Sequence, residues 1–170
     1  MLPSDLRQAE AQALEALLSA LSTDPRGRWT VELRFEGLRL LPLAIRLVSA
    51  LEGQGLPLRM LCADAGATAL ARRDQPSLAP FLASLADHRR LQEVESIQPA
   101  DGGEVPLLVL VGPSPADYDL VEAVCTAHRG GVVSLNPSLE DAAVGIGSVA
   151  RARRKGFLAQ WQTAYTLQPF

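Results

Sequence analysis

Cysteine and histidine, which most metal and redox sites require, are scarce in this sequence. Its 170 residues include two cysteines, Cys62 and Cys125, and two histidines, His88 and His128. Because the cysteines lie far apart in apolar stretches, neither a disulfide framework nor a CxxC site is supported, and we expect buried free thiols. Two histidines are too few for a histidine-rich metal site, and no motif requires a cofactor.

Long apolar runs and a large excess of one charge are also missing. The longest apolar run, residues 105–112, has the length of a strand and is far shorter than the roughly 18 residues of a membrane span. We therefore expect no membrane span, and the N-terminal MLPSDLRQAE does not predict a secretory signal. The 16 basic and 19 acidic residues give a net charge of −3, which provides no general affinity for nucleic acid.

Apolar residues recur at helical or strand spacing along the chain. Helical spacing predicts helices over residues 4–22, 40–51, 67–73, 77–90 and 120–125. Apolar stretches of strand length predict strands over residues 29–35, 56–63, 91–97, 105–111 and 132–135, and a final strand in the aromatic tail 157–170. The alternation in 29–35 indicates a half-buried strand near a sheet edge, whereas the unbroken run 105–111 indicates burial on both faces.

This order of strands and helices predicts an α/β fold. We expect a single three-layer domain over residues 1–170, with a mainly parallel, Rossmann-like sheet and helices on both faces. The right-handed crossover rule places the loops after Ala63, Val111 and Leu135 on one rim of the sheet. Since ligands of such sheets bind at the carboxyl ends of the strands, this rim is the expected site.

Four polar residues follow the strands at this rim: Asp64, Ser114, Asn136 and Ser138. They are candidate ligand contacts, but three of them also have structural roles open to them. Asp64 and Ser114 can each cap the helix that follows, and Asn136 can hold its loop in place. The sequence contains no GxSxG motif, and neither histidine is placed to act as a base for Ser114, which favours a non-enzymatic protein.

The end of the chain is basic. Residues 142–170 hold no carboxylate and four basic groups, Arg151, Arg153, Arg154 and Lys155, whereas residues 1–141 hold 12 basic and 19 acidic groups. The basic run follows GIGS at residues 145–148, where backbone N–H groups could approach an anion, although the pattern is neither a P-loop nor a dinucleotide fingerprint. The arginines either complete an anion site at the rim or face solvent and pair with acids on neighbouring helices.

Six segments carry the resemblance to a known family, in order along almost the whole chain. They are LPSDLRQAEAQALEALLSAL, VELRFEGLRLLPLAIRLVSAL, CADAGATALARR, LLVLVGPSPADYDLVEAV, VVSLNPSLED and GIGSVARARRKGFLAQWQTAYTLQPF. Together they resemble domain-of-unknown-function family nineteen-ninety-five of cyanobacteria and plastids. That family looks like the domain of low-photosystem-two-accumulation assembly factors, and it is also fused to a plastid adenylate kinase.

The resemblance implies a setting in photosynthetic cells. It implies an accessory role in photosystem II assembly, through a protein partner of the photosynthetic apparatus, at or near thylakoid membranes. It carries over no catalytic residue, and the fusion transfers no kinase activity because this chain has no phosphate-binding lysine loop. The resemblance leaves open whether a cytoplasmic protein of this kind associates peripherally with thylakoid membranes.

Two hypotheses about function result. The first is a non-enzymatic module that binds a protein partner. The second is a binder or enzyme for a small anionic ligand or nucleotide, which would use Asp64, Ser114, Asn136, Ser138, Arg151, Arg153 and Arg154. A closed pocket lined by arginine would favour the second hypothesis, and a flat apolar patch would favour the first.

Overall fold

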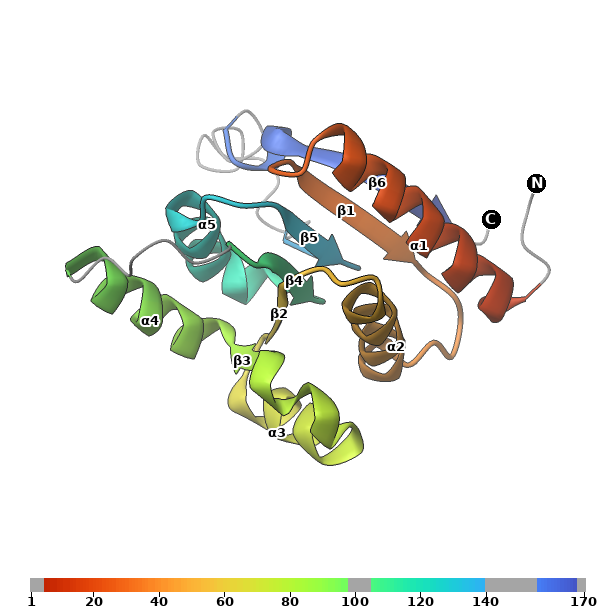
Figure 1. Ribbon diagram of the computed structural model, residues 1–170, viewed down its shortest axis with the longest axis horizontal. Helices are drawn as coiled ribbons and strands as arrows, with labels where there is room; N and C mark the ends of the chain where they lie inside the picture. Colours follow the sequence, from red (N-terminus) through yellow and green to blue (C-terminus); the bar gives the residue numbers. More distant parts are fainter. Residues whose placement is uncertain (1–4, 98–104, 140–155, 168–170) are drawn as a thin grey trace.

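Six parallel strands form one open sheet at the centre of the protein (Figure 1). The computed structural model describes residues 5–97, 105–139 and 156–167. The strands are β1 (Arg28–Leu33), β2 (Leu58–Cys62), β3 (Leu82–Ser84), β4 (Leu107–Val111), β5 (Val132–Leu135) and β6 (Trp161–Leu167). They lie in the order β3-β2-β4-β5-β1-β6, and every neighbouring pair is parallel. The predicted α/β fold with a parallel sheet is confirmed.

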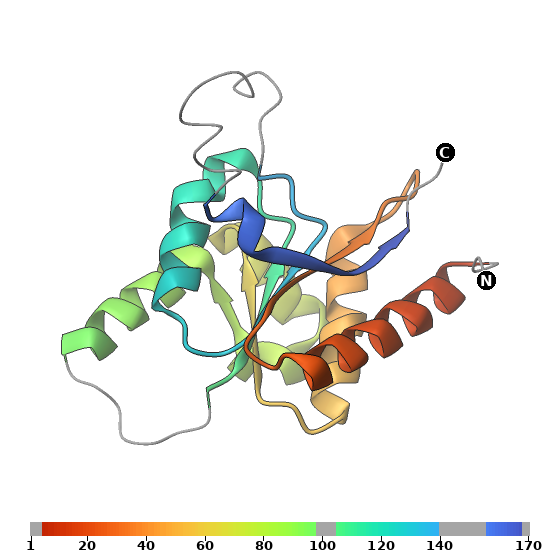
Figure 2. The same cartoon turned by 90° about the horizontal axis from the view of Figure 1, so that it is seen from above.

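Helices cover both faces of this sheet, as predicted. They are α1 (Leu6–Thr23), α2 (Leu40–Gly53), α3 (Ala65–Asp74), α4 (Leu85–Ile97) and α5 (Tyr118–Ala127), and short 3-10 helices span Pro76–Phe81, Pro115–Asp117 and Leu158–Gln160. Buried side chains of α1, α2 and α3 form one apolar cluster with the sheet, and those of α4 and α5 form a second. Figure 2 shows α1 and α2 on one side of the sheet and α4 and α5 on the other.

The apolar spacing of α1 and β1 accounts for their burial. Asp5 caps α1 by accepting a hydrogen bond from the Gln8 backbone N–H at 2.8 Å. In β1 every second side chain is buried, and these side chains belong to the cluster beneath α1 and α2. The alternate side chains of β1, which include Thr30, are half-buried on the opposite face. β1 is therefore the half-buried strand that the sequence predicts, and it lies one strand from the edge.

The predicted final strand is also present. β6 pairs with β1 in parallel at the edge of the sheet, with a register shift between Thr30 and Val31. The Tyr165 hydroxyl donates to Oε1 of Gln12 on α1 at 3.0 Å. The tail therefore extends the sheet beyond β1 and contacts the first helix.

The prediction for residues 77–97 is wrong. A helix over 77–90 followed by a strand over 91–97 is expected, but the structure has the 3-10 helix Pro76–Phe81, then β3, and then α4 through residue 97. The short apolar stretch Leu82–Ser84 pairs with β2, which overrides its helical spacing. Residues 91–97 continue α4 because His88 and Gln92, four residues apart, lie buried on its inner face. The loop expected over 98–104 lies outside the described residues.

Candidate functional site

Two of the predicted rim residues act as caps. The Asp64 carboxylate follows β2 and accepts a hydrogen bond from the Ala67 backbone N–H at 2.8 Å, which caps α3. Ser114 follows β4, and its backbone N–H and its hydroxyl donate to the same oxygen of Asp117, at 2.8 and 3.0 Å. Both side chains therefore take part in helix capping, which is the structural alternative that the sequence leaves open for them.

Asn136 connects the ends of two neighbouring strands. Its side-chain oxygen accepts from the Leu33 backbone N–H at 2.7 Å, and its amide group donates to the Leu33 carbonyl at 2.8 Å. Its own backbone N–H donates to the Val31 carbonyl at 2.9 Å. The backbone φ of 47° lies in the left-handed region, which asparagine tolerates better than most residues. The amide thus extends the pairing of β5 with β1 beyond the last strand residue, as the loop-holding alternative requires.

Ser138, a predicted site residue among those that the structure describes, lines a pocket. Its backbone N–H donates to the Pro113 carbonyl at 2.8 Å, which joins the loops after β4 and β5. Its side chain is exposed. The other predicted site residues, Arg151, Arg153 and Arg154, lie outside the described residues.

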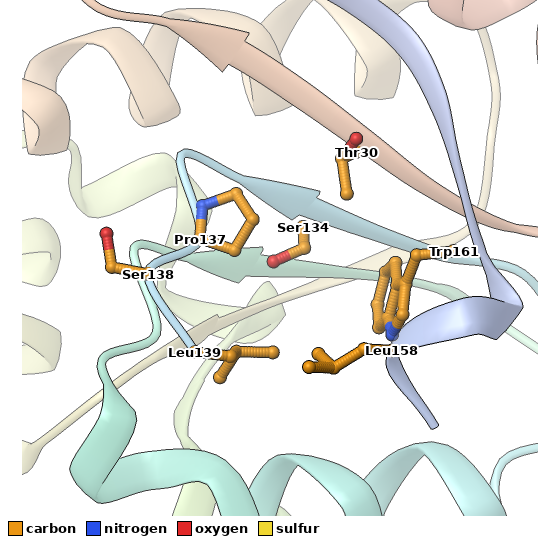
Figure 3. Close-up of a pocket in the computed structure, with 7 residues that line it drawn as sticks. All are labelled: Thr30, Ser134, Pro137, Ser138, Leu139, Leu158 and Trp161. Carbon is orange, nitrogen blue, oxygen red and sulfur yellow. The ribbon is translucent and has the colours of Figure 1, made fainter. Parts of the chain in front are cut away.

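The pocket beside Ser138 lies on the α5 side of the sheet, over β5, β1 and β6 (Figure 3). We call it the sheet-face pocket. It has a volume of about 350 Å³ and is lined by Thr30, Ser134, Pro137, Ser138, Leu139, Leu158 and Trp161. Thr30 and Ser134 are partners in the parallel register of β1 and β5, so their side chains project from the same face. Two small side chains of neighbouring strands therefore form the floor of the pocket, and its walls are mainly apolar.

Two buried polar atoms of the sheet-face pocket make no hydrogen bond. Ser134 is 1% exposed, and both its hydroxyl oxygen and the indole nitrogen of Trp161 lack a partner. The Trp161 ring meets the Phe157 ring edge to face at a centroid distance of 5.8 Å, and the Arg28 guanidinium lies 5.3 Å from the Phe157 centroid. These contacts fix the tryptophan against the second apolar cluster.

Sequence reasoning missed the sheet-face pocket. Its floor comes from Thr30 and Ser134, and each of these lies inside a predicted strand rather than in a loop. One signal was available, namely a serine in the otherwise apolar stretch 132–135, which was expected to be buried. That signal predicts a buried hydroxyl, but it does not predict which strands lie beside it.

The two cysteines are unreactive thiols by their surroundings. Both are free and buried, as expected. Burial raises the pKa of Cys62, and it raises the pKa of Cys125 to about 12. Thiols with such pKa values stay protonated at neutral pH and are poor nucleophiles. Among the described residues, no group of three or more histidine, cysteine, aspartate or glutamate side chains is arranged to hold a metal ion.

The fold and the rim define a class, the Rossmann-like α/β proteins, in which ligands bind at the carboxyl edge of a parallel sheet. The family model for a domain of unknown function, DUF1995, matches residues 3–170, and the chain belongs to this family. This confirms the family that the six sequence segments indicate. No curated protein and no solved structure is significantly similar to the chain. Within the described residues, no helix is long and apolar enough to cross a membrane.

Proposed function

We propose that this protein is a non-enzymatic accessory factor of photosynthetic cells. In this proposal it binds a protein partner of the photosynthetic apparatus, at or near thylakoid membranes, and serves photosystem II assembly. The setting rests on the resemblance of the sequence segments to the low-photosystem-two-accumulation factors. Membership of DUF1995 agrees with that resemblance.

The observation that carries the non-enzymatic part is the use of the rim side chains. The side chains of Asp64 and Ser114 take part in helix caps, and the Asn136 amide takes part in strand pairing. They stabilise the carboxyl ends of the strands instead of presenting a nucleophile and a base to a substrate. A rim of this kind holds the loop surface in a fixed shape, which suits recognition of a partner.

The outer face of α4 supplies an apolar surface for such a partner. Leu91 is 38% exposed and Val94 is 58% exposed, and their spacing of three residues places them side by side on the helix. The far end of α4 projects beyond the sheet in Figure 2. Exposed apolar side chains on a projecting helix favour contact with another protein.

Capture from solubilised thylakoids tests this function. Tagged protein should recover photosystem II subunits or their assembly factors well above an untagged control. Leu91→Asp should reduce this recovery about tenfold or more, because a charge on the outer face of α4 must be desolvated in the interface. Leu70→Asp is the matched control, since Leu70 is an exposed helical leucine (44%) on α3. Recovery of no photosynthetic component, or equal losses for both variants, would argue against the proposal.

A second candidate function is binding or conversion of a small anionic ligand or nucleotide at the carboxyl ends of the strands. The observation in its favour is that Ser138 lines a pocket at the end of β5. It requires a contribution from Arg151, Arg153 and Arg154 beside the rim residues Asp64, Ser114 and Asn136, whose side chains also make hydrogen bonds within the protein.

Thermal unfolding against nucleotides, sugar phosphates and inorganic anions tests the second candidate. A ligand at 100 times its dissociation constant adds about 2.7 kcal/mol to the free energy of unfolding. For a chain of this size, that addition raises the midpoint by about 5 to 10 °C. The double variant Arg151→Ala, Arg154→Ala should lose the ligand-induced shift. Its unfolding midpoint without ligand should equal that of the wild type. If none of these compounds raises the midpoint, or if a shift persists in the double variant, the arginines are not part of a ligand site.

A further inference from the structure

A groove lies at the amino ends of the strands, at the edge of the sheet opposite the rim. Its volume is about 1030 Å³, against about 350 Å³ for the sheet-face pocket. We call it the amino-edge groove, and Figure 2 shows the end of α1 beside the loops that lead into β2 and β5 at this edge. Its apolar walls come from Leu18 and Leu21 of α1, Pro25 before β1, Leu56 and Pro57 before β2, and Val105 before β4.

Backbone contacts hold the loops of the amino-edge groove together. The Leu107 N–H donates to the Pro57 carbonyl at 2.9 Å, which joins the starts of β4 and β2. A Cβ atom at Gly131 would lie 2.5 Å from the Pro25 carbonyl oxygen, so glycine at this position allows the loops before β5 and β1 to approach closely. The groove therefore has a fixed shape, which lowers the entropic cost of binding a partner.

Two arginines give the amino-edge groove a positive charge. Arg26 follows α1 and Arg129 follows α5, and they carry the charge of its described lining. Both residues are exposed, and no carboxylate among the described residues forms an ion pair with either. The whole chain has a net charge of −3, so the lining is opposite in sign to the protein as a whole. Accessible guanidinium groups bind carboxylates through paired N–H donors.

We infer that the amino-edge groove binds a short segment of another protein in which apolar side chains lie next to carboxylates. The apolar side chains cover the leucine, proline and valine walls, and the carboxylates pair with Arg26 and Arg129. At about 30 Å³ for each water-sized volume, the groove has space for roughly three dozen non-hydrogen atoms, which is about four or five residues. This inference goes beyond the proposed function, because it uses a different surface and does not depend on a photosynthetic partner.

The exposure of the lining favours a peptide over a fatty acid, which also joins an apolar body to a carboxylate. Pro25, Pro57 and Val105 are exposed, the last at 47%. An acyl chain on such an open surface leaves one side of its apolar length in water. A peptide can instead turn its polar backbone and polar side chains toward water while its apolar side chains face the groove.

Labelled peptides with blocked ends test the inference on the full-length protein. The probe is fluorescein-labelled EALLFE, and fluorescence anisotropy measures its binding. QALLFQ lacks the carboxylates, KALLFK reverses the charge, and EASSSE lacks the apolar side chains. We expect EALLFE to bind at least about tenfold more tightly than each of the other three. In ¹⁵N-labelled protein, EALLFE should move the NMR signals of Gly130 and Gly131, which line the groove, and should leave that of Gly37 in place.

Charge reversal tests the role of the two arginines. In the double variant Arg26→Glu, Arg129→Glu, the affinity for EALLFE should fall about tenfold or more, and KALLFK should become the tighter ligand. Arg39→Glu is the matched control, since Arg39 is an exposed arginine that precedes α2 at the opposite edge of the sheet. It should leave both affinities within about twofold of the wild type at physiological ionic strength.

Several results would overturn the inference. They are the absence of saturable EALLFE binding up to about 1 mM, equal affinities for EALLFE and QALLFQ, and equal losses in the double variant and in Arg39→Glu. Tighter binding of dodecanoate than of EALLFE would also overturn it and would assign the groove to fatty acids. The wild-type comparison of peptides decides the question even if the double variant does not fold. None of these readouts involves thylakoid capture, so failure here is distinguishable from failure of the proposed partner function.

Discussion

His88 is a buried titratable side chain whose charge state depends on its neighbours. It lies on the inner face of α4 at 6% exposure, and neither ring nitrogen has a hydrogen-bond partner. Burial lowers the pKa of His88 to about 4, and the positive charges of Arg59 on β2 and of His128 after α5 add to this effect. The imidazole is therefore neutral at physiological pH, and its protonation opposes folding.

The pH dependence of stability should report this histidine. Its pKa is about 4 in the folded protein and 6.5 in the unfolded chain, so the unfolded chain binds more protons between these values. The His88 contribution is fully present above pH 6.5 and is lost as the pH falls toward 4, by an amount on the order of 3 kcal/mol. Denaturant unfolding at several pH values should show a steeper loss for the wild type than for His88→Leu, which removes the titrating ring without breaking a hydrogen bond.

The comparison between the two proteins isolates the histidine. Carboxylates also lose their charge in this pH range, but they do so equally in wild type and variant. Above pH 7 the difference in free energy of unfolding between the two should not depend on pH. Parallel curves between pH 6.5 and 4 would contradict the assignment of a depressed pKa to His88.

Among the elements, those with one clear apolar period were predictable. Three apolar patterns each fit only one type of secondary structure, and the structure agrees with all of them. They are the helical stripe of α1, the alternation in β1 and the unbroken run of β4. The region around β3 was not predictable, because a strand of three residues is shorter than one helical turn and leaves the helical period intact. β3 forms because the edge of β2 is available for pairing, and this pairing is a tertiary contact that the local sequence does not specify.

The candidate site also has features that the sequence predicts and features that it does not. Sequence order places the loops after β2, β4 and β5 at one edge, and local chemistry indicates caps at Asp64 and Ser114, so both features could be predicted. The sheet-face pocket could not, because Thr30, Ser134 and Trp161 meet only when β1 lies between β5 and β6. Hydrophobic patterns predict strands, but they do not give the order of strands that are distant in sequence.

At the scale of the whole molecule, the two apolar clusters share their strands. In β2, β4 and β5, buried side chains belong in turn to the cluster beneath α1 to α3 and to the cluster beneath α4 and α5. The buried side chains of β1 belong to the first cluster. Neither cluster can form without the sheet that carries both. We therefore propose that the chain folds as the single domain expected from its length.

The tryptophans test this proposal, since each reports one face of the sheet. Trp29 belongs to the cluster beneath α1, and Trp161 packs against the cluster beneath α5. In Trp161→Phe and in Trp29→Phe, the fluorescence of the remaining tryptophan should follow the loss of helical circular dichroism, with midpoints within about 1 °C of each other. Each variant is its own reference, so the destabilisation caused by the substitution does not matter. If Trp161 fluorescence changed well before the helices melted, β6 would be a separate unfolding unit at the sheet edge, and the single-domain proposal would hold only for the sheet from β3 to β1.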